Sequence, residues 1–399
     1  MNRVAGGVTA PKGFLASGVA CGVKKRGKDL ALIFSERKAT VAGTLTLNAL
    51  RAPCVEWTQR TLQRGSARAI VAVSGNANCC TGRRGAADTE ATARRTAQAL
   101  KIRPTEALVA FTGVIGQPLP MPKIRKGIEQ AAKRISRTGS HLAAEAILTT
   151  DTRPKELAVR FSVQGRPITI GGIAKGSGMV APNMATMLCF LTTDAAVDRT
   201  SLSQVIRQAV EESFNAITVD GETSTNDMAL ILANGAAGAA PLRPGQPAFR
   251  IFAQGVRTVC RYLAHEIVRD GEGVTRLMQV TVRRAANSSQ ARKIAQRIAN
   301  SPLVKTMVAG RDPNWGRVAA AVGASGCRID PKRLAIRLGK VTVFRNGEPI
   351  QLSRQTLLQQ VDHSEVAIGV DLGLGKGEHQ LLSADLTEEY VRINAKYTS

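Results

Sequence analysis

Aromatic residues and histidines are scarce in this chain. Phe, Trp and Tyr together make up 4% of its 399 residues, and only four histidines occur. Proteins that bind single-stranded nucleic acid stack bases on several exposed rings, so this scarcity argues against that class. The histidines stand in no HxxxH or HExxH spacing, and no G-x-S-x-G motif occurs. The sequence therefore favours neither a metal site nor a conventional histidine-driven triad.

Long apolar runs and paired cysteines are also missing. No stretch of about eighteen apolar residues occurs, as a membrane-spanning helix would need. Pro11, Lys12 and several glycines interrupt the N-terminal apolar segment, which does not fit a secretory signal. The seven cysteines form no CxxC motif, and the adjacent Cys79 and Cys80 have an awkward geometry for a disulfide. We therefore expect a reducing, cytoplasmic location.

Acidic residues are few compared with basic ones. The chain has 30 Asp and Glu against 55 Lys and Arg, which gives a formal net charge of +25. A field of this sign attracts phosphates and acidic metabolites. The basic residues are scattered, however, and Lys24–Arg26 is the densest group. A solvated basic surface is the simpler interpretation, and a nucleic-acid-binding protein without catalysis stays a distant alternative.

Short apolar runs typical of strands outnumber the helical patterns. The runs begin at Ala31, Ala69, Ala107, Leu157, Pro167, Met187, Met228, Leu277, Leu334, Val341 and Val366. The clearest helical periodicities cover Asp88–Leu100, with Asp88 as its N-cap, Met121–Ser136, Ser201–Ile217 and Ser288–Ala299. Because several strands follow one another without a helix, the pattern predicts an α+β fold with mixed sheets. Pro241–Phe249 is the expected boundary loop before a smaller C-terminal domain from about residue 245.

Two glycine-rich segments imitate phosphate-binding loops. GSGMVA begins at Gly176, but Pro182 prevents the helix that should receive a pyrophosphate. LGLGKG, near Lys376, lacks the glycine spacing and the Ser or Thr after lysine that a phosphate loop requires. Both segments are therefore interpreted as turns.

The most informative segment is 171–195, with the sequence GGIAKGSGMVAPNMATMLCFLTTDA. Its loop ends in the small residue Ala185, and Thr186 then opens an apolar run of strand character. In a bent loop, the Thr186 hydroxyl could attack the carbonyl of Ala185 and cleave the chain. The freed α-amine, with a pKa of roughly 7.7 to 8.0, could then accept the hydroxyl proton of the same residue. The pattern also fits an ordinary turn that enters a core strand.

Two further loops contain residues that could assist a reaction at Thr186. Thr112 and Gly113 follow the apolar run ALVAF, so they could supply a hydroxyl and a backbone N–H to an oxyanion. Glu272 stands between glycines in DGEGVTR, which suits a carboxylate that binds a cationic ligand. Each loop taken alone also fits a plain turn.

A series of strings in chain order resembles one family over the whole length: the self-processing ornithine acetyltransferases, or glutamate N-acetyltransferases, of arginine biosynthesis. The strings are GGVTAPKGFLASGVACGVKK at Gly6, VSGNANCCTG at Val73, TGVIG at Thr112, TTDT at Thr149, AKGSGMVAPNMATML at Ala174, ITVDGETSTND at Ile217, DGEGVTR at Asp270, DPNWGR at Asp312 and NAKYTS at Asn394. So many ordered strings are specific to that family.

The resemblance implies that one precursor cuts itself between Ala185 and Thr186. The products would be an α segment, 1–185, and a β segment, 186–399, commonly associated as α2β2. Thr186 would take the acetyl group from N-acetylornithine and pass it to glutamate in a ping-pong reaction. The implied fold is a layered αββα sandwich like those of aminopeptidase-like and N-terminal-nucleophile enzymes, with a smaller C-terminal α/β domain. No cofactor is implied, and use of acetyl-CoA by a bifunctional enzyme stays open.

The resemblance also implies roles for individual residues. Thr112 and Gly113 would form the oxyanion hole, and the substrate contacts would be Thr149, Thr150, Lys175, Thr186, Glu272, Asn394 and Ser399. Lys175 suits an α-carboxylate and Glu272 an ornithine ammonium. The partners would be small molecules rather than nucleic acid or membrane. A self-processing aminopeptidase or amidase, in which water replaces glutamate, is the alternative enzyme.

Overall fold

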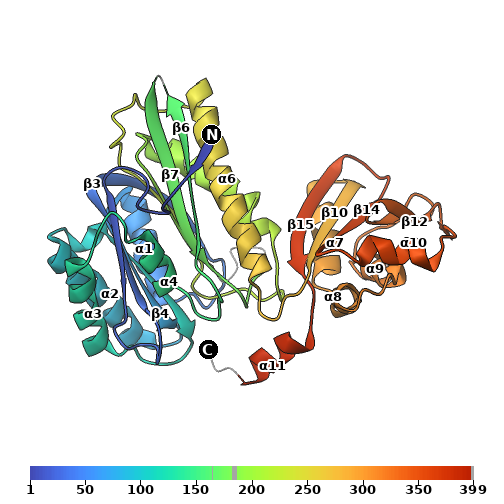
Figure 1. Cartoon of the computed structure of the whole chain (residues 1–399), viewed down its shortest axis with the longest axis horizontal. Helices are drawn as coiled ribbons and strands as arrows, with labels where there is room; N and C mark the ends of the chain where they lie inside the picture. Colours follow the sequence, from blue (N-terminus) through green and yellow to red (C-terminus); the bar gives the residue numbers. More distant parts are fainter. Residues whose placement is uncertain (164, 182–186, 397–399) are drawn as a thin grey trace. The chain divides into compact units, whose positions relative to one another are not determined.

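The computed structural model describes residues 1–163, 165–181 and 187–396. Figure 1 shows its helices and strands, which form two compact units. The larger unit contains Met1–Asn215 and Glu222–Ile267. The smaller unit contains Ala216–Gly221 and the chain from Val268 to the end of helix α11 (Glu388–Lys396).

Within the described residues, the larger unit is built on one nine-stranded sheet in the order β1-β6-β7-β8-β9-β3-β4-β5, with β2 also paired to β3. The strands are β1 (Asn2–Val4), β2 (Phe14–Val19), β3 (Leu30–Leu45), β4 (Ser66–Asn76), β5 (Ala107–Val114), β6 (Lys155–Val163), β7 (Arg166–Lys175), β8 (Leu188–Thr193) and β9 (Met228–Ala233). Most neighbours are antiparallel, but β4 and β5, like β8 and β9, are parallel.

Strand β3 joins the two halves of this sheet. Its first residues, Leu30–Phe34, pair with β2 on one side and β4 on the other. Its last residues, Thr40–Leu45, pair with β9. The register to β4 shifts between Phe34 and Ala39, and such an irregularity bends a strand. One long strand can therefore serve both halves.

The middle strands are covered on both faces. Every residue of β8 and β9 is buried, so their apolar runs show no alternation with polar residues. Helix α6 (Pro247–Arg269) lies along β6 and β7 in Figure 1. A Cβ on Gly172 of β7 would lie 2.9 Å from a Val259 side-chain atom of α6, so glycine permits this close approach. This packing places most of α6 in the larger unit.

The other helices of the larger unit are α1 (Pro53–Arg64), α2 (Gly82–Leu100), α3 (Met121–Lys133), α4 (Ser140–Ala146) and α5 (Arg199–Glu211), with a short 3-10 helix, η1 (Pro104–Glu106). Hydrogen bonds fix α1 to β5: Trp57 Nε1 donates to the Ala107 carbonyl at 2.9 Å, and the Thr58 hydroxyl donates to the Val109 carbonyl at 2.9 Å. Helix and sheet therefore meet through polar as well as apolar contacts.

The described part of the smaller unit has a six-stranded sheet in the order β13-β12-β11-β14-β10-β15. Its strands are β10 (Leu277–Ala285), β11 (Ala335–Leu338), β12 (Val341–Arg345), β13 (Glu348–Pro349), β14 (Glu365–Asp371) and β15 (Gly377–Ala384). Before α11 come η2 (Phe214–Ala216), which ends at the start of this unit, α7 (Ser288–Ala299), α8 (Pro302–Ala309), α9 (Trp315–Gly323) and α10 (Arg354–Val361). Its core joins Val280 and Val282 of β10 to Ile294 and Ile298 of α7.

The predicted α+β class with layered helices and mixed sheets is confirmed. Each unit contains parallel and antiparallel strand pairs. The expected boundary loop at 241–249 runs into the first turn of α6, and the chain enters the main part of the smaller unit only at Val268 because α6 packs on β7. Among the helices that the structure describes, none combines the length and apolar character needed to cross a bilayer.

Candidate active site

The edge of the sheet where β8 starts gathers several predicted site residues. Three others lie outside the described residues: Ala185, Thr186 and Ser399. Met187 is the first described residue after Thr186, and β8 begins directly after it. Because Leu188 of β8 pairs with Lys175 at the end of antiparallel β7, Lys175 lies at this edge.

Lys175 is buried within a polar cluster. Its side chain is only 3% exposed, and its Nζ donates to the Thr149 hydroxyl at 2.7 Å. The same Nζ lies 3.9 Å from Asp151 Oδ2. The structure therefore brings together two residues that the resemblance assigned to substrate binding, Thr149 and Lys175. Thr150 follows in the same loop and is partly buried.

Asp151 is the anion of this cluster. Its Oδ1 accepts from Lys155 Nζ at 2.7 Å and from the Gly176 N–H at 2.7 Å. Burial alone would raise the pKa of the Asp151 carboxyl, but the charges of Lys175 and Lys155 and these hydrogen bonds lower it to about 2. Asp151 is therefore ionised at neutral pH, with two lysines around it.

Lys24 adds a third cation near the Thr149 loop. Its Nζ donates to the carbonyl of Leu148 at 2.9 Å. Burial lowers the pKa of Lys24, the carboxylates of Asp29 and Asp151 raise it, and the charge of Lys175 lowers it. Lys24 therefore adds a positive charge close to this loop.

Thr112 and Gly113 lie at the end of β5, in the same unit. Thr112 is buried, and Gly113 pairs with Gly75 of β4. Gly113 has a φ of +131°, and a Cβ there would lie 2.3 Å from the carbonyl carbon of Gly75. Only glycine fits this position, because both the dihedral angle and the neighbouring backbone exclude a side chain.

Glu272 and Asn394 meet in the smaller unit. Asn394 Nδ2 donates to Glu272 Oε2 at 2.8 Å, and Glu272 is 8% exposed. Gly273, with a φ of +68°, lets this loop approach the Tyr390 backbone of α11, where a Cβ would lie 2.5 Å from the nitrogen. The structure thus joins two predicted substrate residues that are 122 positions apart in the chain.

Three residues close to the predicted ones were not predicted from the sequence. Asp151 stands inside the quoted string TTDT, and Asn226 and Asp227 end the string ITVDGETSTND. Asp227 Oδ1 accepts from the Met187 N–H at 2.8 Å, so it contacts the backbone next to the predicted nucleophile. For Asp227 the available signal was a carboxylate directly before an apolar strand, but its partner comes from a distant part of the chain.

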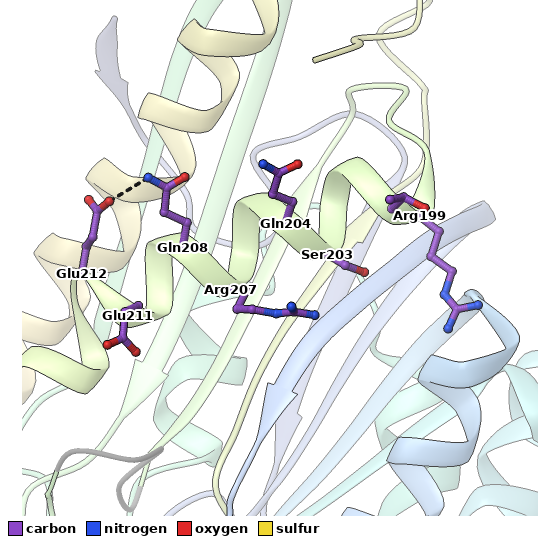
Figure 2. A pocket seen from close by; sticks show the side chains of 8 residues that line it. Arg199, Ser203, Gln204, Arg207, Gln208, Glu211 and Glu212 are labelled. Carbon is purple, nitrogen blue, oxygen red and sulfur yellow. Dashed lines mark hydrogen bonds between the residues drawn. The ribbon is translucent and has the colours of Figure 1, made fainter. Parts of the chain in front are cut away.

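A separate pocket of about 820 Å³ lies on the exposed face of α5. Figure 2 shows its lining side chains, with Gln208 donating to Glu212 at 2.9 Å. None of the predicted site residues lines it. No histidine or cysteine lines it beside the hydroxyls of Thr200 and Ser203. No group of His, Cys, Asp and Glu suited to a metal ion occurs in the described stretches of the chain.

Comparisons with known proteins identify the family of the chain. The model of the ArgJ family matches residues 15–399. The chain belongs to the ArgJ family. Its relatives include the arginine biosynthesis bifunctional protein ArgJ of Symbiobacterium thermophilum, which is 48% identical over the full length of both chains. The protein of the same name from Synechocystis is 44% identical over 99% of this chain and 98% of its own.

A solved structure shares the family name as well. The crystal structure of ArgJ from Bacillus halodurans is 40% identical with a TM-score of 0.50, and the match covers 52% of this chain and 98% of that one. The predicted family is therefore confirmed. With it the prediction of an acyltransferase of arginine biosynthesis is confirmed, and the hydrolase alternative is not favoured.

Proposed function

We propose that this ArgJ enzyme cuts itself between Ala185 and Thr186, and that Thr186 then carries an acetyl group from N-acetylornithine to glutamate. The observation that carries the proposal is the sheet edge at the start of β8. There Lys175, hydrogen-bonded to Thr149, lies opposite the second residue after Thr186. A positive, buried cluster beside a nucleophile suits an amino-acid substrate that must be held by its carboxylate.

The acetyl transfer needs no group beyond the residues of this site. Thr186 Oγ attacks the acetyl carbon of N-acetylornithine while the α-amine of Thr186 takes the hydroxyl proton. The carbon–nitrogen bond breaks, the departing ornithine amine takes that proton, and the acetyl group stays on Oγ as an ester. The amine of glutamate then attacks the ester, and its proton returns to Thr186 Oγ through the α-amine.

The oxyanion of each tetrahedral intermediate would bind to Thr112 and Gly113. A hydroxyl and a backbone N–H are the donor types that serve this purpose, and loss of one such donor costs about a hundredfold to a thousandfold in kcat. The close pairing of Gly113 with Gly75 keeps the donor backbone fixed before substrate binds. Such preorganisation is what makes a donor effective in a transition state.

Each polar cluster would bind a substrate group of the opposite charge. Lys175, with Thr149 and Thr150, would bind the α-carboxylate of either substrate. Glu272 would bind the side-chain ammonium of N-acetylornithine, with Asn394 and the C-terminal Ser399 as neutral polar contacts. Within the part of the chain that the structure describes, Glu272 is hydrogen-bonded to a neutral amide, which leaves its negative charge for a cationic ligand and supports this role.

We also propose that the segments 1–185 and 186–399 stay together, as α2β2, in the cytoplasm, and that acetyl-CoA is a second acetyl donor. The match to the Bacillus halodurans structure supports a break near the middle of the chain. Nearly all of that chain is covered, yet it accounts for only 52% of this one.

Intact mass spectrometry with N-terminal sequencing tests the cleavage. The expected result is two chains, the second beginning Thr-Met-Leu-Cys, and a single chain for Thr186→Ala. Incubation with N-acetylornithine, with and without glutamate, tests the reaction. Formation of acetylglutamate supports transfer, whereas acetate release that glutamate does not change would support a hydrolase.

A further inference from the structure

Two consecutive residues directly before β9 contact the backbone at Phe111 and at Met187. Asn226 is 3% exposed and Asp227 is 1% exposed. Burial of an amide and a carboxyl is unfavourable unless each finds hydrogen-bond partners, so their partners show what the two side chains hold. Neither residue is explained by the proposed chemistry of Thr186.

Asn226 holds the segment that leads into Thr112. Its Nδ2 donates to the carbonyl of Ala77 at 2.6 Å and to the carbonyl of Phe111 at 3.0 Å. Its Oδ1 accepts from the Thr225 hydroxyl at 2.6 Å, which fixes the orientation of the amide. The Phe111 carbonyl belongs to the peptide group that joins Phe111 to Thr112. Asn226 therefore positions the backbone directly before the proposed oxyanion residues.

Asp227 holds the backbone directly after Thr186. Its Oδ1 accepts from the Met187 N–H at 2.8 Å, and that nitrogen is bonded to the carbonyl carbon of Thr186. Its Oδ2 is buried and has no hydrogen-bond partner among the residues that the structure describes. Burial raises the pKa of the Asp227 carboxyl well above its ordinary value, against the lowering effects of the Met187 N–H, the Lys175 charge and a hydrogen bond with the Ser224 side chain. Such a group destabilises a fold, so stability alone does not explain it.

The backbone that carries this pair is itself fixed. The Thr225 carbonyl accepts from the Ala52 N–H at 3.0 Å, and the Asp227 carbonyl accepts from the Thr46 N–H at 2.9 Å. Asp227 is followed at once by β9, whose residues are all buried. The two side chains therefore project from a rigid support.

We propose that Asn226 and Asp227 are positioning residues, which set the separation between the nucleophile and the oxyanion donors. They do so by holding the Phe111 carbonyl and the Met187 N–H from adjacent positions of one rigid segment. The inference rests on the proposed roles of Thr112 and Thr186. A displacement of about 1 Å at a reacting group can lower a rate about a hundredfold.

The C-terminal ends of β8 and β9, on the opposite side of the sheet from Met187 along the strands, provide a matched control. Asp194 follows β8, and its carboxylate accepts from the N–H groups of Thr169 at 2.8 Å and Lys12 at 3.0 Å. Asn234 follows β9, and its Nδ2 donates to the Lys12 carbonyl at 3.0 Å. Because β8 and β9 are parallel, this second pair lies away from Met187. The same residue types hold backbone groups there, with no predicted site residue among them.

The test compares alanine variants of the pair before β9 with alanine variants of the pair that follows β8 and β9. For each of N226A, D227A, D194A and N234A, the cleaved fraction is measured by intact mass, and kcat and KM for N-acetylornithine and Tm are measured on the cleaved protein. We expect N226A and D227A to lower the rate of cleavage or kcat by about a hundredfold with KM changed by less than about threefold. We expect D194A and N234A to lower Tm by as much as N226A and D227A do, while kcat stays at the wild-type value.

Isosteric variants keep the test decisive if an alanine variant does not fold. D227N retains an oxygen for the Met187 N–H, so kcat should return to within about tenfold of wild type with an unchanged pH profile. N226D loses both donated hydrogen bonds and should be as slow as N226A. Equal losses of kcat in both pairs would show a structural role only. A D227N enzyme as slow as D227A, or with a shifted pH profile, would make Asp227 an acid–base group and overturn positioning.

The outcome for Thr186→Ala separates this inference from the function on which it rests. If that variant keeps its activity, the proposed nucleophile is wrong whatever Asn226 and Asp227 do. If it is inactive while N226A and D227A have wild-type kcat, only the positioning inference fails.

Discussion

The two polar clusters of this enzyme differ in the sign of the charge that they present. The cluster at the end of β7 places Lys155 and Lys175 around one carboxylate, Asp151. The pair in the smaller unit places a carboxylate, Glu272, beside a neutral amide, Asn394. Among these described residues, the first group has two cations to one anion and the second has one anion. A carboxylate would suit the first group and an ammonium the second.

Removal of the Lys175 charge should have the largest effect on activity. Lys175→Met should lower kcat/KM for N-acetylornithine about a hundredfold or more, because loss of a buried charged partner costs about 2–5 kcal/mol in binding. Lys155→Met is the control within the cluster. Lys155 pairs directly with Asp151 at 2.7 Å, so its loss should instead lower the unfolding free energy, by about 3–5 kcal/mol. Steady-state kinetics and urea unfolding of both variants check this, and equal kinetic losses would contradict the division of roles.

Neutralisation of the second cluster should act on one substrate more than on the other. Glu272→Gln should raise KM for N-acetylornithine about tenfold to a hundredfold, since a hydrogen bond to a charged group contributes about 1.5–3 kcal/mol. The half-reaction with glutamate, which has no side-chain ammonium, should change much less. Separate titration of each substrate measures the difference, and equal changes for both would remove the proposed ammonium site.

Acid should weaken the first cluster through Asp151. Its pKa is lowered to about 2 in the folded protein, so its ionised form stabilises the fold above its unfolded pKa of about 3.9. This contribution, about 2 kcal/mol, should be lost as pH falls from about 4 to about 2. Urea unfolding of the wild type and of Asp151→Asn over that range isolates the contribution. An identical pH dependence in both would contradict it.

Removal of Asn394, the neutral partner of Glu272, should have the smallest effect on activity. Asn394→Ala removes one hydrogen bond to Glu272 and should raise KM for N-acetylornithine about twofold to tenfold, as expected for about 0.5–1.5 kcal/mol. Asn394→Asp places a second carboxylate beside Glu272 and serves as the contrasting variant. We expect the Asn394→Asp enzyme to regain affinity for the ammonium substrate relative to Asn394→Ala, and a further loss would argue against a cationic ligand here.

Strands and apolar helices could be predicted from the sequence because their patterns are local. Helix α7 has the predicted bounds, since Ile294 and Ile298 recur at helical spacing and the Asn287 side chain caps it. Helix α5 begins at Arg199 with Asp198 as its N-cap and ends at Glu211, and is therefore shorter at its C-terminal end than predicted. Local capping groups thus decide the ends of such helices.

Helices with a polar buried face could not be predicted in this way. Helix α2 begins at Gly82, not at the predicted Asp88, because its first half buries Gly85, Thr89 and Thr92 and shows no apolar periodicity. Helix α1 was missed for a related reason: two of its four buried residues are threonines, Thr58 and Thr61. Their hydroxyls bond to backbone carbonyls, which a hydrophobic pattern does not show.

The residues of the candidate site likewise fall into those that the sequence predicts and those that only the structure shows. Thr149, Lys175, Glu272 and Asn394 were identified through motifs, and the structure adds the contacts Lys175–Thr149 and Glu272–Asn394. Asp227 was missed because its partner, the Met187 N–H, is 40 residues away and carries no side-chain signal. Residues that hold a backbone across strands become visible only when the sheet register is known.

The most direct test of the central claim is the mass of the β segment after incubation with N-acetylornithine in the absence of glutamate. We predict that it becomes heavier by one acetyl group, that peptide mapping places the group on Thr186, and that added glutamate removes it as acetylglutamate. An enzyme that transfers acetyl groups while this segment never gains mass, or gains it at another residue, would contradict the account.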